Sequence, residues 1–196
     1  GLAQVGEQKV PLGDVVDIMK AEGREPRAEV EYWAPKTVPL GEIGDQHFAY
    51  SFAAQALEIE LDIETGEVRV LKVIAATDVG KALNPLGLEG QIEGGIMMGI
   101  GHTLTEEYIV EEGQVFSDVM ARYRIPSIAF MPEIYPIVIE HPVAEGPYGG
   151  KGVGEIVIIP TPPAVANAIY RACGVRLKSI PIDQDALALQ ILELNN

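Results

Sequence analysis

Hydrophobic and polar residues alternate along Ala56–Ile63. Leucine and isoleucine take every second position while Glu58, Glu60 and Asp62 lie between them, which is the two-residue period of a strand with one buried face. The residues that follow, Glu64-Thr65-Gly66, are typical of a turn, and the apolar run Val68–Ala76 predicts a returning strand. The pattern therefore predicts two neighbouring antiparallel strands.

A helical period comes next. Asn84-Pro85 is typical of a helix start, since asparagine caps free N–H groups and proline loses nothing in the first turn. Four apolar residues then recur every fourth position: Leu88, Ile92, Ile96 and Ile100. We predict a helix from Pro85 to about Leu104. Its glycines would each weaken an isolated helix by up to about 1 kcal/mol relative to alanine, so we expect very close packing to compensate.

The remaining pattern predicts helices and strands in alternation. Helices are expected at Leu12–Lys20, from Thr161 to about Gly174, and at Gln184–Leu194 with Asp183 as its cap. Strands are expected at Tyr135–Glu140 and Leu177–Ile182, a hairpin at Glu106–Val110 and Gln114–Phe116, and an extended segment near Ala28–Ala34. Because strands come in neighbouring pairs with helices between them, we predict an α+β fold with mixed or antiparallel sheets and packed helices.

Composition limits what the protein does. A chain of 196 residues, 47% of them hydrophobic, suffices for one domain or for two subdomains, roughly 1–80 and 81–196. A net charge of −15 argues against nucleic acid as a partner, because phosphate binding needs a basic face. Cys173 is the only cysteine, which excludes an internal disulfide and a cysteine-only metal site and fits a cytoplasmic location. No apolar run is long enough to predict a membrane span.

The richest candidate for chemistry is the loop Gly146–Glu155, which is crowded with glycine and ends on a carboxylate. Glycine lets backbone N–H groups approach an anion or a cofactor closely, although a plain turn with a solvated glutamate would have the same composition. The loop is not a nucleotide P-loop, since Lys151 is followed by Gly152 rather than by serine or threonine. A dinucleotide-binding loop is also excluded, because the required third glycine and downstream acidic residue are missing.

A second candidate is the predicted helix around Gln91. Its glycines serve tight helix packing in one interpretation, with Gln91 as a surface amide. In the other, two glycine-rich surfaces hold one large planar ligand, and the Gln91 amide both donates and accepts hydrogen bonds. The histidines His47, His102 and His141 lack metal-ligand spacing, so we expect no metal ligated by protein side chains.

Together these motifs resemble one family. The matching segments are Asp78-Val79-Gly80 with Asn84-Pro85, Gly90–Gly95 through Glu106-Glu107, Gly146-Pro147 with Lys151–Glu155, and Ala164–Tyr170. In order and spacing they are similar to the molybdenum hydroxylases, the xanthine dehydrogenase and aldehyde oxidase family. The resemblance covers about Tyr50 to Ile182 and is to the C-terminal part of the molybdopterin-binding subunit. It implies that residues 1–196 are part of that domain.

The resemblance also implies roles for residues. Glu155 would be the general base in hydroxylation of an aldehyde or purine-like carbon with water-derived oxygen, a role that suits a carboxylate whose pKa is raised by burial. Gln91 would hydrogen-bond the cofactor near the metal, and Lys151, Gly152, Val153 and Gly154 would line its pterin side. The metal would be carried by molybdopterin, in its cytosine dinucleotide form in many bacteria, which agrees with the lack of protein ligands.

The resemblance implies partners as well, because the family's subunit is several times longer than this chain. We expect an excised fragment or one piece of a split subunit, inactive alone. It would function in a hetero-oligomer with the N-terminal part of the molybdopterin subunit and with 2Fe-2S and FAD domains or subunits, acting on a small-molecule substrate. The alternative is a non-catalytic relative or assembly module of such a complex.

Overall fold

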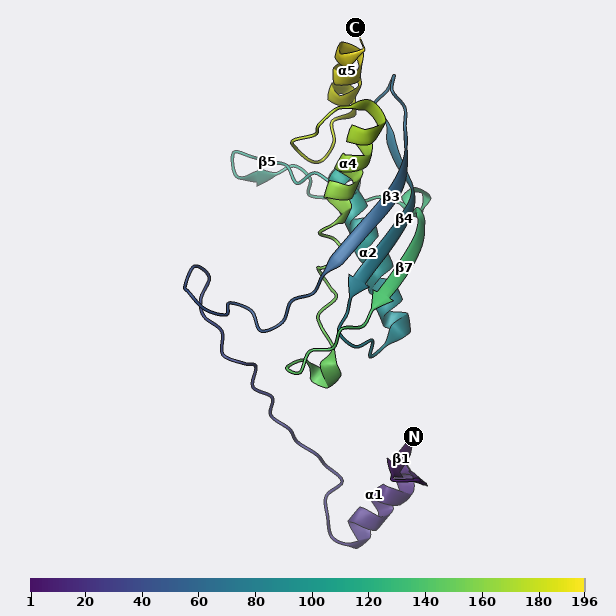
Figure 1. Ribbon diagram of the computed structural model, residues 1–196, viewed down its shortest axis with the longest axis vertical. Helices are drawn as coiled ribbons and strands as arrows, with labels where there is room; N and C mark the ends of the chain where they lie inside the picture. The colour runs from purple at the N-terminus through teal and green to yellow at the C-terminus, as the bar shows by residue number, and fades with distance from the viewer. Residues whose placement is uncertain (196) are drawn as a thin grey trace. The chain divides into compact units, whose positions relative to one another are not determined.

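The computed structural model of the chain describes residues 1–195. The chain divides into two compact units, Gly1–Pro35 and Lys36–Asn196 (Figure 1). This division falls at a different place from the boundary suggested near residue 80. All the candidate site residues belong to the second unit.

The first unit is a hairpin followed by a helix. Strands β1 (Leu2–Val5) and β2 (Gln8–Pro11) pair antiparallel, and α1 (Leu12–Ala21) follows directly. The helix confirms the prediction, whereas the hairpin was not predicted because each of its strands is only four residues long. Residues 28–34 have no regular secondary structure.

The second unit is built on a three-stranded sheet in the order β3–β4–β7. Strands β3 (Ala53–Leu61) and β4 (Val68–Asp78) are the predicted antiparallel pair. Strand β7 (Glu133–Ile139) lies beside β4 in the parallel direction, after a connection that contains a long helix. The sheet is therefore mixed, which confirms the predicted fold class.

A β-bulge keeps the apolar residues of β4 on one face. Glu58 pairs with Lys72 and Ile59 with Val70, so Leu71 is an extra residue in β4. Side chains alternate between the two faces of a strand, so without an extra residue Val70 and Val73 would point in opposite directions. With the bulge, both valines are buried while Leu71 is exposed.

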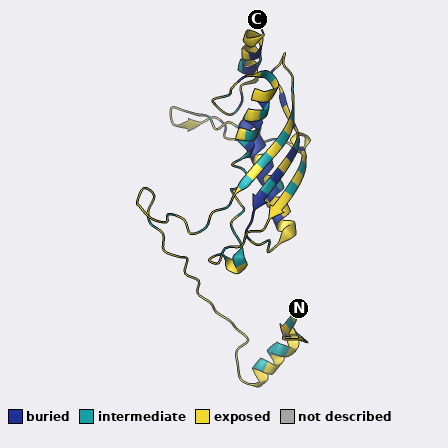
Figure 2. Cartoon of the chain, viewed as in Figure 1, coloured by how far each residue is buried: buried dark blue, intermediate teal, exposed yellow. Residues whose placement is uncertain are grey.

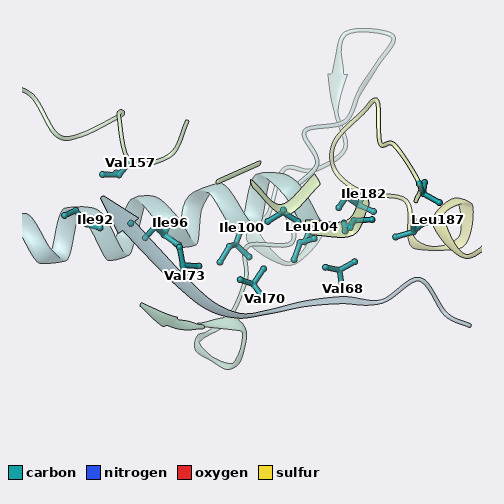
Figure 3. Close-up of a cluster of buried hydrophobic side chains, with 14 of the residues drawn as sticks. Val68, Val70, Val73, Ile92, Ile96, Ile100, Leu104, Val157, Ile182 and Leu187 are labelled. Carbon is teal, nitrogen blue, oxygen red and sulfur yellow. The ribbon is translucent and has the colours of Figure 1, made fainter. Parts of the chain in front are cut away.

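Helices α2 (Pro85–Leu104) and α4 (Thr161–Cys173) cover the buried face of the sheet. Their apolar residues and those of β4 form one core, and the outer side of the sheet is exposed (Figures 2 and 3). The predicted four-residue stripe of α2 is part of this core: Leu88, Ile92, Ile96 and Ile100 are all buried. Asn84 caps the helix by accepting a hydrogen bond from the Gly87 amide, as predicted.

Glycine allows α2 to touch the segment that leads into α4. A Cβ atom on Gly95 would overlap the Val157 side chain, and one on Gly99 would overlap Thr161. Both neighbours are completely buried. The close packing that we expected for this glycine-rich helix is therefore made against residues 157–161.

The remaining elements are short or terminal. Strands β5 (Val110–Glu111) and β6 (Gln114–Val115) form a hairpin shorter than predicted, and α3 (Met120–Tyr123) follows it. Two 3-10 helices, η1 (Ile128–Phe130) and η2 (Pro147–Gly149), flank β7 in sequence. Helix α5 (Gln184–Leu194) is capped by Asp183, as predicted. Within the described residues, no helix combines the length and the apolar character needed to cross a bilayer.

The predicted strand at Leu177–Ile182 is wrong. This segment pairs with no strand of residues 1–195, and the Ile182 amide instead donates to the Thr103 carbonyl at the end of α2. Pro181 has no N–H to offer a neighbouring strand, which disfavours a ladder here. Within the segment, Ile182 is buried and Leu177 packs partly against the core, whereas Ile180 is exposed.

The two glycine environments of α2 predict opposite effects of the same substitution. Gly90→Ala meets no atom within 4 Å and should stabilise the chain by up to about 1 kcal/mol through helix propensity. Gly95→Ala should destabilise it by about 1–2 kcal/mol, because Val157 must move. Urea unfolding followed by circular dichroism measures both. Equal stability changes would contradict the close packing at Gly95.

Candidate functional site

The glycine-rich loop is attached to the end of β4 by a buried ion pair. Lys151 Nζ donates to Asp78 Oδ2 at 2.6 Å, and the two side chains are only 3% and 7% exposed. The Lys151 amide also donates to the Val79 carbonyl at 2.9 Å. Residues 73 positions apart in the sequence are thereby fixed side by side.

Gly80 makes this attachment possible. Its φ of 68° is in the left-handed region, and a Cβ atom there would overlap the Gly149 carbonyl oxygen. The Gly80 amide donates to Asp78 Oδ1 at 3.0 Å, so both carboxylate oxygens of Asp78 are bonded. The glycine-rich loop therefore packs on, and hydrogen-bonds to, the turn Asp78-Val79-Gly80.

These bonds determine the ionisation of Asp78. Burial raises the pKa of its carboxyl, but the hydrogen bonds from the Lys151 ammonium and the Gly80 amide lower it by more. The net pKa lies below the ordinary value of 3.8, so Asp78 is ionised when it binds Lys151.

A second attachment holds the other side of Glu155. Gln55 in β3 donates through Nε2 to the Val157 carbonyl at 2.8 Å. Its Oε1 accepts from the Thr161 hydroxyl at 2.8 Å, so the amide is used at both ends. Gln55 pairs with Ala75 across the sheet, close to the end of β4 that carries Asp78. Sequence reasoning missed both Gln55 and Thr161, because neither residue belongs to a glycine-rich motif.

Glu155 lies in the short stretch between the two attachments, and its side chain is exposed. Its backbone carbonyl accepts from the Ile158 amide at 3.0 Å, which begins the turns before α4. The burial expected of a general base is thus not supplied by the described residues. Any group that covers Glu155 would have to come from outside them.

Gln91 is an exposed residue of α2. Val157 packs on Gly95, one turn further along α2. Figure 3 shows Val157 beside the part of α2 that carries Ile92 and Ile96. Met98, which is 48% exposed, lies seven residues after Gln91 and therefore on the same side of the helix. Sequence reasoning identified Gln91 and Glu155 as separate candidates, and the fold places their segments next to each other.

At four positions of these two segments, nothing in the described part of the chain requires the residue to be glycine. Gly90 and Gly94 of α2, and Gly152 and Gly154 of the loop, are exposed, and none has a φ in the left-handed region. A Cβ atom on any of them would meet nothing within 4 Å. Neither backbone conformation nor internal packing requires glycine at these positions. They leave bare backbone beside Gln91 and Glu155.

The ligand chemistry of the side chains is limited. In the described part of the chain, no group of three or more His, Cys, Asp or Glu side chains is arranged to hold a metal ion. Lys151, a candidate for cofactor binding, has its ammonium group bound to Asp78. What the segment from Lys151 to Gly154 presents outward is mainly backbone.

Such bare backbone lets a ligand approach the main chain closely. A family model described as "Molybdopterin cofactor-binding domain" matches residues 1–132. The chain therefore belongs to the molybdopterin cofactor-binding domain family. Gln91 lies within the matched range, and Glu155 lies beyond it.

Curated relatives are named as subunits of xanthine dehydrogenase and of aldehyde oxidoreductase. The chain is 37% identical over 162 residues to a protein of Bacillus subtilis described as a probable subunit of xanthine dehydrogenase, covering 83% of this chain and 22% of that protein. It is 33% identical to the aldehyde oxidoreductase molybdenum-binding subunit PaoC of Escherichia coli, over 79% of this chain and 21% of that subunit. The chain thus spans about a fifth of the length of these relatives.

A solved structure shares the fold. The aldehyde oxidoreductase from Desulfovibrio desulfuricans superposes with a TM-score of 0.72 and 31% identity, over 87% of this chain and 19% of that one. The family resemblance inferred from the glycine motifs is confirmed.

The buried ion pair predicts a pH-dependent stability. Asp78→Asn should destabilise the chain at neutral pH by roughly 3–5 kcal/mol, because it leaves the Lys151 ammonium buried without a counter-charge. Since the folded pKa of Asp78 is lowered, its contribution is present above pH 3.8 and is lost as the pH falls below that value. The variant should therefore lose less stability on acidification than the parent chain, as measured by urea unfolding at pH 7 and about pH 3.

Lys81→Met is the matched control. Lys81 Nζ also lies 2.6 Å from a carboxylate, that of Glu140, but this pair is exposed. Its loss should change the free energy of unfolding by less than about 1 kcal/mol. An equal effect of the two substitutions would show that burial is not what makes the Asp78 pair important.

Proposed function

We propose that this chain forms one wall of the active site in the molybdenum-cofactor subunit of a xanthine dehydrogenase or aldehyde oxidase type enzyme. The observation that carries the proposal is the bare backbone of Gly90, Gly94, Gly152 and Gly154. An exposed glycine inside a helix costs up to about 1 kcal/mol relative to alanine. Close approach of a ligand to the backbone compensates such a cost, and a pterin is planar enough to lie there.

Specific contacts follow from the exposed groups. Gln91 hydrogen-bonds the cofactor near its metal through an amide that both donates and accepts. Lys151, Gly152, Val153 and Gly154 line the pterin side, and they do so mainly through the backbone because the Lys151 ammonium is bound to Asp78. Molybdopterin, with or without a cytosine nucleotide, brings its own metal ligands, which suits a wall whose described residues form no cluster of ligating side chains.

The bound cofactor would supply the water-derived oxygen and accept the two electrons removed from the substrate carbon. Glu155 is the general base for hydroxylation of an aldehyde or of a purine-like N-heterocycle. Because the loop is attached on both sides of Glu155, the carboxylate has little orientational freedom to lose when it points at the reacting atoms. The opposite wall, which covers Glu155 and excludes water, comes from outside this chain.

The enzyme is a hetero-oligomer in this proposal. Electrons leave through 2Fe-2S and FAD centres, and a chain with Cys173 as its only cysteine holds no cysteine-ligated cluster. These centres lie on other domains or subunits of a cytoplasmic complex, together with the N-terminal part of the molybdopterin subunit. The 196-residue chain by itself is inactive.

The role of Glu155 is tested by Glu155→Gln in the complete complex. Turnover should fall by at least about 100-fold, since general base catalysis contributes on the order of 10²–10⁴. The molybdenum content per subunit should stay unchanged. Glu112→Gln, an exposed glutamate in the β5–β6 hairpin, is the control and should keep normal turnover. Retention of normal turnover by the Glu155 variant would remove Glu155 from the mechanism.

The cofactor wall is tested by adding a side chain to α2. Gly94→Leu should lower the molybdenum content of the purified complex several-fold, because a leucine side chain would occupy the surface where the pterin lies. Gly13→Leu is a matched control, since Gly13 is also an exposed helical glycine with no atom within 4 Å of its Cβ position. Equal molybdenum contents in the two variants would contradict the proposed wall.

The alternative is an assembly module that keeps the glycine packing of Gly95 and Gly99 without chemistry. It differs in one measurable property. A native complex that contains this chain but no molybdenum and no pterin would favour the assembly module over the enzyme.

A further inference from the structure

The glycine loop is held at both ends, and Glu155 lies between the fixed ends. At one end, the Lys151 ammonium is bonded to Asp78 and the Lys151 amide to the Val79 carbonyl. At the other end, the Val157 carbonyl accepts from Gln55. Both supports belong to neighbouring strands of one sheet, since β3 and β4 pair directly.

The glycines of the loop between these ends add no contacts of their own, whereas Val153 and Ile156 pack partly against the core. A Cβ atom on Gly152 or Gly154 would touch nothing within 4 Å, and both residues are exposed. Glycine is the residue with the largest backbone freedom, so a segment with this composition does not hold a side chain in one place unaided. Beyond the packing of Val153 and Ile156, the position of the Glu155 carboxylate depends on the two ends.

The two supports are polar side chains that are hydrogen-bonded at both of their ends. Asp78 uses both carboxylate oxygens and Gln55 uses both ends of its amide. A buried ion pair adds little net stability over an apolar pair of the same size, but it defines one geometry. The Gln55 amide is likewise bonded at both ends, since it accepts from the Thr161 hydroxyl and donates to the Val157 carbonyl.

We infer that Asp78 and Gln55 are positioning residues for Glu155: they hold the two ends of residues 151–157 on the sheet and so fix where the Glu155 carboxylate points. This inference rests on the proposed function of Glu155. Neither residue touches the substrate or the cofactor. Asp78 acts through the Lys151 ammonium, and Gln55 acts through the Val157 carbonyl.

The experiment uses the complete complex with three variants. Gln55→Glu keeps the shape of the side chain and the acceptor for Thr161, but it removes the donor to the Val157 carbonyl. Asp78→Glu keeps the charge and adds one methylene group to the support of Lys151. Lys81→Met, which removes the exposed pair with Glu140, is the control.

Turnover is expressed per molybdenum atom, so that loss of cofactor does not count as loss of positioning. We expect Gln55→Glu and Asp78→Glu each to lower it by about 10- to 100-fold, because misplacement by roughly 1 Å costs about that much. The molybdenum content should stay within about twofold of the parent complex, and Lys81→Met should change neither quantity. Normal turnover per molybdenum in both variants would overturn the inference, as would a loss of activity that follows molybdenum content alone.

Two further measurements separate positioning from a general structural role. Combined with Glu155→Gln, neither substitution should reduce turnover further, since a residue that acts only through Glu155 has nothing left to position. In the cofactor-free complex, the amides of Lys151 and Ile158 should exchange hydrogen at least about tenfold faster in Asp78→Glu and in Gln55→Glu than in the parent. The exchange of the α5 amides should stay unchanged. Additive losses, or unchanged exchange at both amides, would overturn the inference.

Failure of the proposed function gives a different result. If the parent complex lacks molybdenum, or if Glu155→Gln alone keeps normal turnover, Glu155 is not the base. If Glu155→Gln is inactive while both support variants are normal, the base stands and only the positioning is wrong.

Discussion

The contact of α2 with residues 157–161 is the constraint on which the rest of the second unit depends. Gly95 and Gly99 let the helix approach Val157 and Thr161 more closely than any residue with a Cβ atom would allow. This approach buries Val157 and Thr161 completely and aligns the start of α4 against the middle of α2. The same approach brings Val157, two residues after Glu155, against α2 one turn from Gln91. Packing and site geometry therefore share one cause.

Helix α2 has a different use for glycine on each side. On the inner side, Val157 and Thr161 occupy the space that side chains at Gly95 and Gly99 would fill. On the outer side, the space that side chains at Gly90 and Gly94 would fill is empty within the described chain. A helix of this composition is weak in isolation, and the buried stripe of leucine and isoleucine compensates through tertiary packing. Only the inner glycines are explained by the fold, which is why the outer ones point to a ligand.

Strong periodic patterns predicted the fold well, and long-range polar contacts were out of reach. The strands at β3 and β4 and the helices α1, α2, α4 and α5 follow from alternation, apolar stripes and capping residues within each segment. The parallel pairing of β7 with β4 could not be predicted, because it depends on how the connection through α2 returns to the sheet. The strand expected at Leu177–Ile182 failed because the amide of Ile182 bonds to Thr103, a contact outside the segment.

The same limit applies to the site. Glycine spacing and a terminal carboxylate singled out Glu155 and Gln91. The residues around Lys151 in the sequence did not indicate that its ammonium group would pair with Asp78. That ion pair changes the role that we infer for Lys151. A cation beside a glycine-rich loop suggests an anion-binding group, whereas a lysine that is 3% exposed and bonded to an ionised aspartate is a support for the loop. With the Lys151 charge neutralised by Asp78, the segment from Lys151 to Gly154 presents mainly its backbone, which glycine leaves open to close approach.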